Sequence, residues 1–71
     1  MTDTATIRIN GQTESLAAAT IAALLDEKEI GADARGVAVA LNGEVVPRAA
    51  WPETRLSPGD AVEIVRAYQG G

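Results

Sequence analysis

Two Asn-Gly pairs, Asn10-Gly11 and Asn42-Gly43, each separate two runs of strand-forming residues. Both central residues of a type I′ turn have positive φ angles, which Asn tolerates and Gly adopts freely, and this turn matches the twist of paired strands. Asn-Gly between such runs is therefore typical of a tight β-hairpin. The sequence predicts two hairpins, and this constrains the fold more than any other feature.

The strands of the predicted hairpins differ in how clearly they alternate. Residues 6–10 alternate with Ile7 and Ile9 on one face, and residues 37–41 alternate with small alanines between larger apolar residues. The returning strands are residues 12–16, whose pattern is poor, and residues 44–46. Pro47 has no N–H group for a strand ladder, so we expect the second hairpin to end there.

Between the hairpins, apolar residues recur at helical spacing, namely Ile21, Leu24 and Leu25. Two starting points compete. The alanine-rich run favours a start near Ser15 by propensity alone, whereas Thr20 has the chemistry of an N-cap. We expect Gly31 to be the C′ residue that follows the helix.

The second half of the chain predicts a turn and a last strand. Residues 48–57 look irregular, with a short helical turn near Trp51-Pro52-Glu53. Ser57-Pro58-Gly59-Asp60 has the signature of a type II turn, in which Gly accepts the positive φ. Residues 61–67 form the predicted last strand, with Val62 and Ile64 facing the core and Arg66 continuing that face.

Seventy-one residues make one small domain. Two hairpins, a helix and a last strand bury their apolar faces together when the helix packs across one face of a mixed sheet. We therefore expect an α+β fold of the ubiquitin-like β-grasp type, with four to five strands and one main helix. Residues 1–67 are the expected domain, and residues 68–71 are expected to form a flexible C-terminal tail.

Composition excludes several functions. The chain has no Cys and no His, so the usual nucleophile, general base and metal ligands are absent, and a self-contained catalytic pocket is not expected. Asp26, Glu27 and Glu29 fit a solvated helix face better than a metal site. With six Lys and Arg against ten Asp and Glu, the net charge of −4 argues against nucleic-acid binding. No signal peptide or membrane span is recognisable, so we expect a soluble, cytoplasmic protein.

The sequence ends on Gly70-Gly71. Glycine has no Cβ, so a diglycine segment can enter a narrow channel, and its terminal carboxyl carbon is unhindered. The alternative is an unstructured end of no functional importance. The two glycines alone do not decide between these interpretations.

Several motifs at matching spacing extend over nearly the whole chain. They are residues 37–48 (VAVALNGEVVPR), Trp51, Pro58-Gly59-Asp60 and Gly70-Gly71. In this combination the chain resembles the ThiS family, the sulfur carriers of the thiamine pathway. The most specific element is Val46-Pro47-Arg48 followed three residues later by Trp51, together with the diglycine end.

The resemblance implies a carrier mechanism and no bound cofactor. An E1-like adenylyltransferase would activate the Gly71 carboxylate with ATP and magnesium, and a persulfide donor would convert it to a thiocarboxylate. Thiazole synthase would then take the sulfur. The chain would be a protein co-substrate and not an enzyme.

Partner contacts are expected at two places. Tyr68, Gln69 and Gly70 would thread into the partner beside Gly71. The other candidates are Arg48, Trp51 and Arg66, although Trp51 fits a structural role at least as well because a domain this small needs its core covered.

Three other functions fit the same features. A molybdopterin-pathway sulfur carrier would share the fold, the diglycine and the activation chemistry. A ubiquitin-like modifier would join its terminus to lysines. A β-grasp interaction module would not use its glycines at all.

Overall fold

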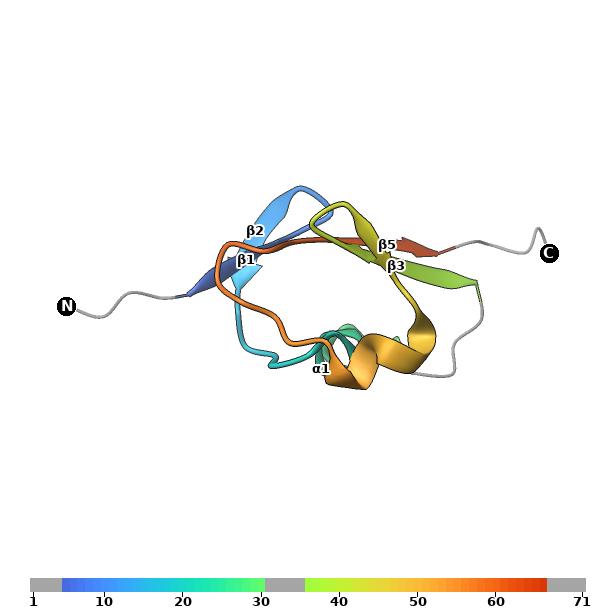
Figure 1. The fold of residues 1–71 in the computed structure, drawn as a ribbon. Helices are drawn as coiled ribbons and strands as arrows, with labels where there is room; N and C mark the ends of the chain where they lie inside the picture. Colours follow the sequence, from blue (N-terminus) through green and yellow to red (C-terminus); the bar gives the residue numbers. More distant parts are fainter. Residues whose placement is uncertain (1–4, 31–35, 67–71) are drawn as a thin grey trace.

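The computed structural model describes residues 5–30 and 36–66. Five strands form one mixed sheet, and one α-helix and a 3₁₀ helix pack on one side of it (Figure 1). The elements in chain order are β1 (Thr6–Ile9), β2 (Gln12–Ser15), α1 (Ile21–Glu27), β3 (Val37–Leu41), β4 (Glu44–Val46), the 3₁₀ helix η1 (Arg48–Glu53) and β5 (Ala61–Arg66). This is the expected α+β architecture.

The last strand lies in the middle of the sheet, whose order is β2-β1-β5-β3-β4. β5 runs parallel to β1 and antiparallel to β3, while each hairpin contributes one antiparallel pair. The hairpins alone would be two separate two-stranded ribbons, which are marginal in water. β5 joins them, because it pairs with β1 of the first hairpin and with β3 of the second.

Both hairpin turns and the turn before β5 have the predicted backbone. Asn10 and Asn42 have φ angles of 53° and 52°, and the glycine after each is also positive. Gly59 has a φ of 86°, and the N–H of Asp60 donates to the carbonyl of Ser57 at 3.1 Å, as the predicted type II turn requires.

The start of α1 is the one indicated by Thr20. Its hydroxyl oxygen accepts a hydrogen bond from the N–H of Ala23 at 3.1 Å, which satisfies one of the free donors of the first turn. Ser15 instead belongs to β2. The helix cannot begin there because residues 12–15 pair with β1, so sheet pairing overrides the local alanine propensity.

The predicted end of α1 is wrong. The helix ends at Glu27, and the residue with the left-handed conformation is Glu29, with a φ of 62°, rather than Gly31, which lies outside the described residues. The N–H groups of Glu29 and Ile30 donate to the carbonyls of Asp26 and Leu25, the two bonds of a Schellman motif. Burial of Ile30, which is 5% exposed, fixes this end of the helix.

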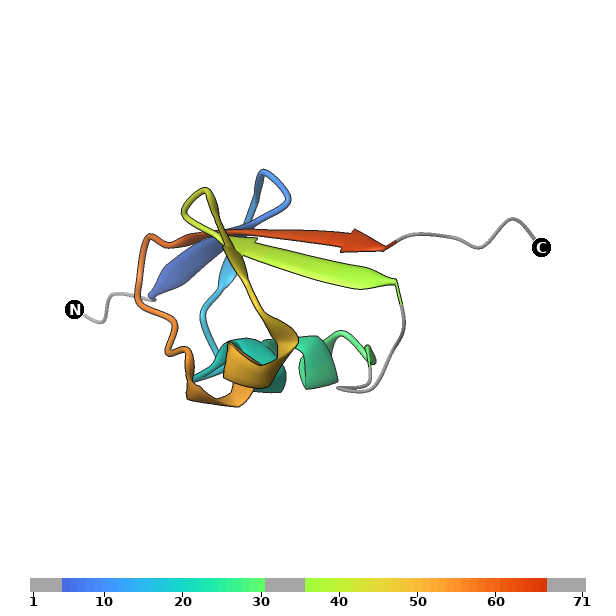
Figure 2. The ribbon, with the colours of Figure 1, turned by 45° about the vertical axis from the view of Figure 1, so that its right-hand side comes forward.

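The core lies between the sheet and the two helices. Its largest fully buried side chains come from all of these layers: Trp51, Ile7, Ile21, Leu25, Val39 and Val62. The 3₁₀ helix is longer than the single turn expected near Trp51-Pro52-Glu53, and it carries the Trp51 indole under the sheet. Figure 2 shows α1 and η1 side by side below the strands.

Candidate functional site

The predicted site residues fall into two groups. Tyr68, Gln69, Gly70 and Gly71 lie outside the described residues, so their predicted roles stay predictions. Arg48, Trp51 and Arg66 are described. The structure brings the first two together and places Arg66 at a different site.

β5 is the last described strand before Gly71 in the sequence, and the two hairpin turns hold it. The Asn10 side chain accepts a hydrogen bond from the N–H of Ile64 at 2.8 Å and donates one to its carbonyl at 3.3 Å. The side-chain oxygen of Asn42, Oδ1, accepts a hydrogen bond from the N–H of Ala61 at 2.9 Å. Each asparagine therefore forms its turn and also binds the backbone of β5 beyond the regular ladder. Only the first of these roles was predictable from the Asn-Gly pairs in the sequence.

Asp60 is a turn residue, as its place in the sequence indicated. Its carboxylate accepts hydrogen bonds from the N–H of Ser57 at 2.8 Å and from the Asn42 amide at 3.1 Å. Both bonds hold the start of β5 in place, so the Asp60 carboxylate has a structural role.

Arg48 and Trp51 form a cation–π pair. The guanidinium carbon of Arg48 lies 5.4 Å from the centre of the indole ring. Trp51 is 2% exposed, and its ring N–H donates to the carbonyl of Val46 at 2.9 Å. The indole thus joins β4 to η1, which favours the structural role and leaves little of the ring for a partner. The specific Val-Pro-Arg and Trp spacing corresponds to this contact.

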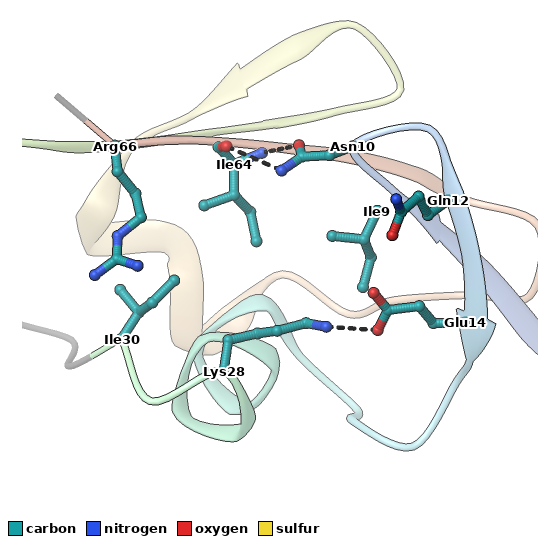
Figure 3. A pocket seen from close by; sticks show the side chains of 8 residues that line it. All are labelled: Ile9, Asn10, Gln12, Glu14, Lys28, Ile30, Ile64 and Arg66. Carbon is teal, nitrogen blue, oxygen red and sulfur yellow. Dashed lines mark hydrogen bonds and ion pairs between the residues drawn. The ribbon is translucent and has the colours of Figure 1, made fainter.

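Arg66 lines a groove at the other end of the sheet. The groove has a volume of about 400 Å³ and lies between β1, β2 and β5 on one side and the end of α1 on the other (Figure 3). Its polar residues are Asn10, Gln12, Glu14, Lys28 and Arg66, and its apolar residues are Ile9, Ile30 and Ile64. Sequence reasoning missed this groove, and the only signal was that Arg66 continues the core face of β5.

The groove carries a distinctive charge pattern. Lys28 and Glu14 form an ion pair of 2.5 Å across it, and their side chains are about one-third exposed, at 33% and 34%. The Arg66 side chain extends toward Ile30 on the other side of the groove (Figure 3). Among residues 5–30 and 36–66, no hydrogen bond or ion pair of the Arg66 side chain is present.

Other site types find no support in the described part of the chain. No group of three or more acidic residues is placed to hold a metal ion there, and Asp26, Glu27 and Glu29 are exposed as expected. No helix among these residues is long and apolar enough to cross a membrane.

Comparison with known proteins gives consistent results. The ThiS family model matches residues 7–71. The sulfur carrier protein ThiS of Thermus thermophilus is 38% identical over 63 residues, which cover 89% of this chain and 95% of that protein. A thiazole synthase of Paramagnetospirillum magneticum is 41% identical over 64 residues, covering 89% of this chain but only 19% of that protein.

Solved structures agree with the fold. The crystal structure of the thiamine biosynthesis protein ThiS from Geobacter metallireducens has a TM-score of 0.75 and 35% identity, covering 93% of this chain and 99% of that chain. A solution structure of a thiamine biosynthesis protein from the same organism gives the same TM-score of 0.75 at 33% identity, with 93% and 87% covered.

Proposed function

The chain belongs to the ThiS family, the sulfur carrier proteins of thiamine biosynthesis, and we propose that it carries sulfur as a thiocarboxylate on Gly71. The observation that supports this residue most directly is that the family match extends to Gly71. The lack of Cys and His in the sequence fits, because a carrier of this kind needs no side-chain nucleophile of its own.

The proposed chemistry begins with activation. A carboxylate is a poor electrophile, so an E1-like adenylyltransferase uses ATP and magnesium to join AMP to the Gly71 carboxylate and releases pyrophosphate. The persulfide of a donor protein then attacks the acyl carbon and displaces AMP. A thiol cleaves the resulting S–S bond, supplies two electrons, and leaves the thiocarboxylate on Gly71.

Thiazole synthase is the proposed acceptor of the sulfur. Its support is the relative of that name, which contains a segment similar to this chain over 19% of its length. When the sulfur is transferred, an oxygen from water or from the acceptor replaces it on the acyl carbon and regenerates the carboxylate, so the chain acts as a co-substrate of the enzymes around it. The thiamine-pathway family match favours this role over the molybdopterin carrier and the protein modifier.

The fold is suited to presenting a reacting terminus. β5 is held by β1, β3 and both hairpin turns, so the strand before the terminal segment is firmly placed. Residues that bind partners commonly extend from such a rigid scaffold.

Adenylation of C-terminal variants tests the proposal. A chain lacking Gly71 and a Gly70→Trp variant should both keep the fold, because the described sheet, helices and core are built from residues 6–66. Both should lose pyrophosphate release in the presence of the adenylyltransferase, ATP and magnesium. A Thr13→Ala variant, exposed in β2 and outside the groove, is the control and should react like the wild type. Equal activity of the wild type and the chain lacking Gly71 would contradict the proposal.

A further inference from the structure

The activation chemistry proposed above assigns no task to the groove beside Arg66. We propose that it is a docking site for thiazole synthase, and that it receives a segment of that enzyme with a carboxylate side chain next to an apolar one. This inference rests on the proposed function, because it assumes that thiazole synthase approaches Gly71.

Part of the inner surface of the groove is apolar, and three isoleucines supply it. Ile9 and Ile30 are each 5% exposed, and Ile64 is half-buried beside them. The three side chains come from β1, from the end of α1 and from β5, and they point toward the same space (Figure 3). Because Ile9 and Ile30 are already buried, an aliphatic or aromatic side chain placed here would mainly cover Ile64 and remove its apolar area from water.

The charges around the groove indicate which polar group the bound segment should carry. Lys28 is neutralised by Glu14, so the ion pair leaves Arg66 as the positive charge of the groove. This local positive charge stands out because the whole chain has a net charge of −4. The Arg guanidinium presents a planar fork of donors that matches a carboxylate, and charge complementarity of this kind sets specificity between proteins.

The position of the groove indicates which partner covers it. β5 and α1 end on the same side of the molecule (Figure 2). Arg66 precedes Gly71 by five residues, which span at most about 17 Å when extended. An enzyme that takes sulfur from Gly71 therefore acts within this distance of Arg66, close enough for its surface to reach the groove. Thiazole synthase is the enzyme indicated, because the thiazole synthase relative contains a segment similar to this chain.

Charge reversal at two arginines tests the assignment. Arg66→Glu should weaken binding to purified thiazole synthase by about tenfold or more. Arg8→Glu is the matched control: Arg8 is exposed in β1, next to the buried Ile7 and Ile9, so it lies on the face of the sheet away from the groove. It changes the net charge equally and should alter the dissociation constant by no more than about twofold.

The measurement is titration calorimetry of each variant with thiazole synthase, with circular dichroism to verify folding. Unchanged affinity of the folded Arg66→Glu variant, or an equal loss with Arg8→Glu, would overturn the proposal. The same variants are titrated with the adenylyltransferase. A loss there that equals or exceeds the loss with thiazole synthase would assign the groove elsewhere and overturn the proposal as well.

The design separates this inference from the proposed function. Binding of the unmodified wild-type chain to thiazole synthase needs no sulfur, so it is measured whether or not Gly71 is adenylated. Failure of adenylation would overturn the carrier mechanism and leave the binding comparison intact. If Arg66→Glu weakened binding to thiazole synthase no more than Arg8→Glu does, the groove would be excluded as the docking site. The carrier mechanism would be unaffected by that result.

Discussion

The side-chain amide of Asn10 pairs with the backbone of Ile64, 54 positions later in the chain, through one accepted and one donated hydrogen bond. The amide group has the donor and acceptor of a peptide unit, so it extends the contact between the first hairpin and β5 past the end of β1. The same residue has the positive φ that its turn requires. One side chain therefore connects local turn formation to the order of the sheet.

The Asn10 contact makes a prediction about stability. Asn10→Gly keeps a residue that adopts positive φ freely and removes the side chain with its amide, so we expect a loss of about 1–2 kcal/mol in the free energy of unfolding. The measurement is urea denaturation. The exposed Arg8→Ala variant is the control and should change stability by less than about 0.5 kcal/mol. Stability of Asn10→Gly equal to the wild type would show that the two hydrogen bonds contribute nothing net.

At the end of α1 we expect a substitution to raise stability instead of lowering it. Glu29 has a φ of 62°, a conformation that a residue with a Cβ adopts at a cost. Glu29→Gly removes that cost and should raise the free energy of unfolding by about 0.5–1 kcal/mol.

Ala23→Gly is the matched control for Glu29→Gly. Ala23 lies inside α1 with ordinary helical geometry, so the same added flexibility should lower stability there by about 1 kcal/mol. Thermal unfolding followed by circular dichroism measures both variants. A Glu29→Gly variant that melts below the wild type would refute this account of the helix end.

A substitution at Trp51 distinguishes a structural role of this residue from a role in docking. Trp51→Phe keeps an aromatic ring in the core and removes the N–H that donates to Val46, so we expect a loss of about 1–3 kcal/mol in stability. Affinity for the adenylyltransferase should stay at the wild-type value when both are folded. Wild-type stability combined with weakened binding would instead place Trp51 in an interface.

The sequence predicted the parts of the fold that short segments encode. Asn10-Gly11, Asn42-Gly43 and Thr20 specify their turns and helix cap by their own chemistry, and the structure confirms all three. The end of α1 was not predictable in this way. Glu29 is an unusual residue for left-handed backbone, and burial of Ile30 against the rest of the core determines the outcome.

The candidate site was predicted less completely. Its diglycine and its family motifs are visible as short strings, whereas the groove depends on tertiary structure. Ile9, Lys28 and Arg66 meet there only because β5 lies beside β1 and the end of α1 faces both. Arg66 was identified as a candidate, but its neighbours belong to segments far away in the sequence.

The most direct test of the carrier mechanism is the intact mass of the purified chain after incubation with adenylyltransferase, ATP, magnesium and a persulfide donor, followed by fragmentation of its C-terminus. We predict exchange of one oxygen for sulfur, located on Gly71 and absent when ATP is omitted. An unchanged mass, with an enzyme and donor shown to be active on another carrier protein, would contradict the assignment of Gly71 as the sulfur-carrying residue.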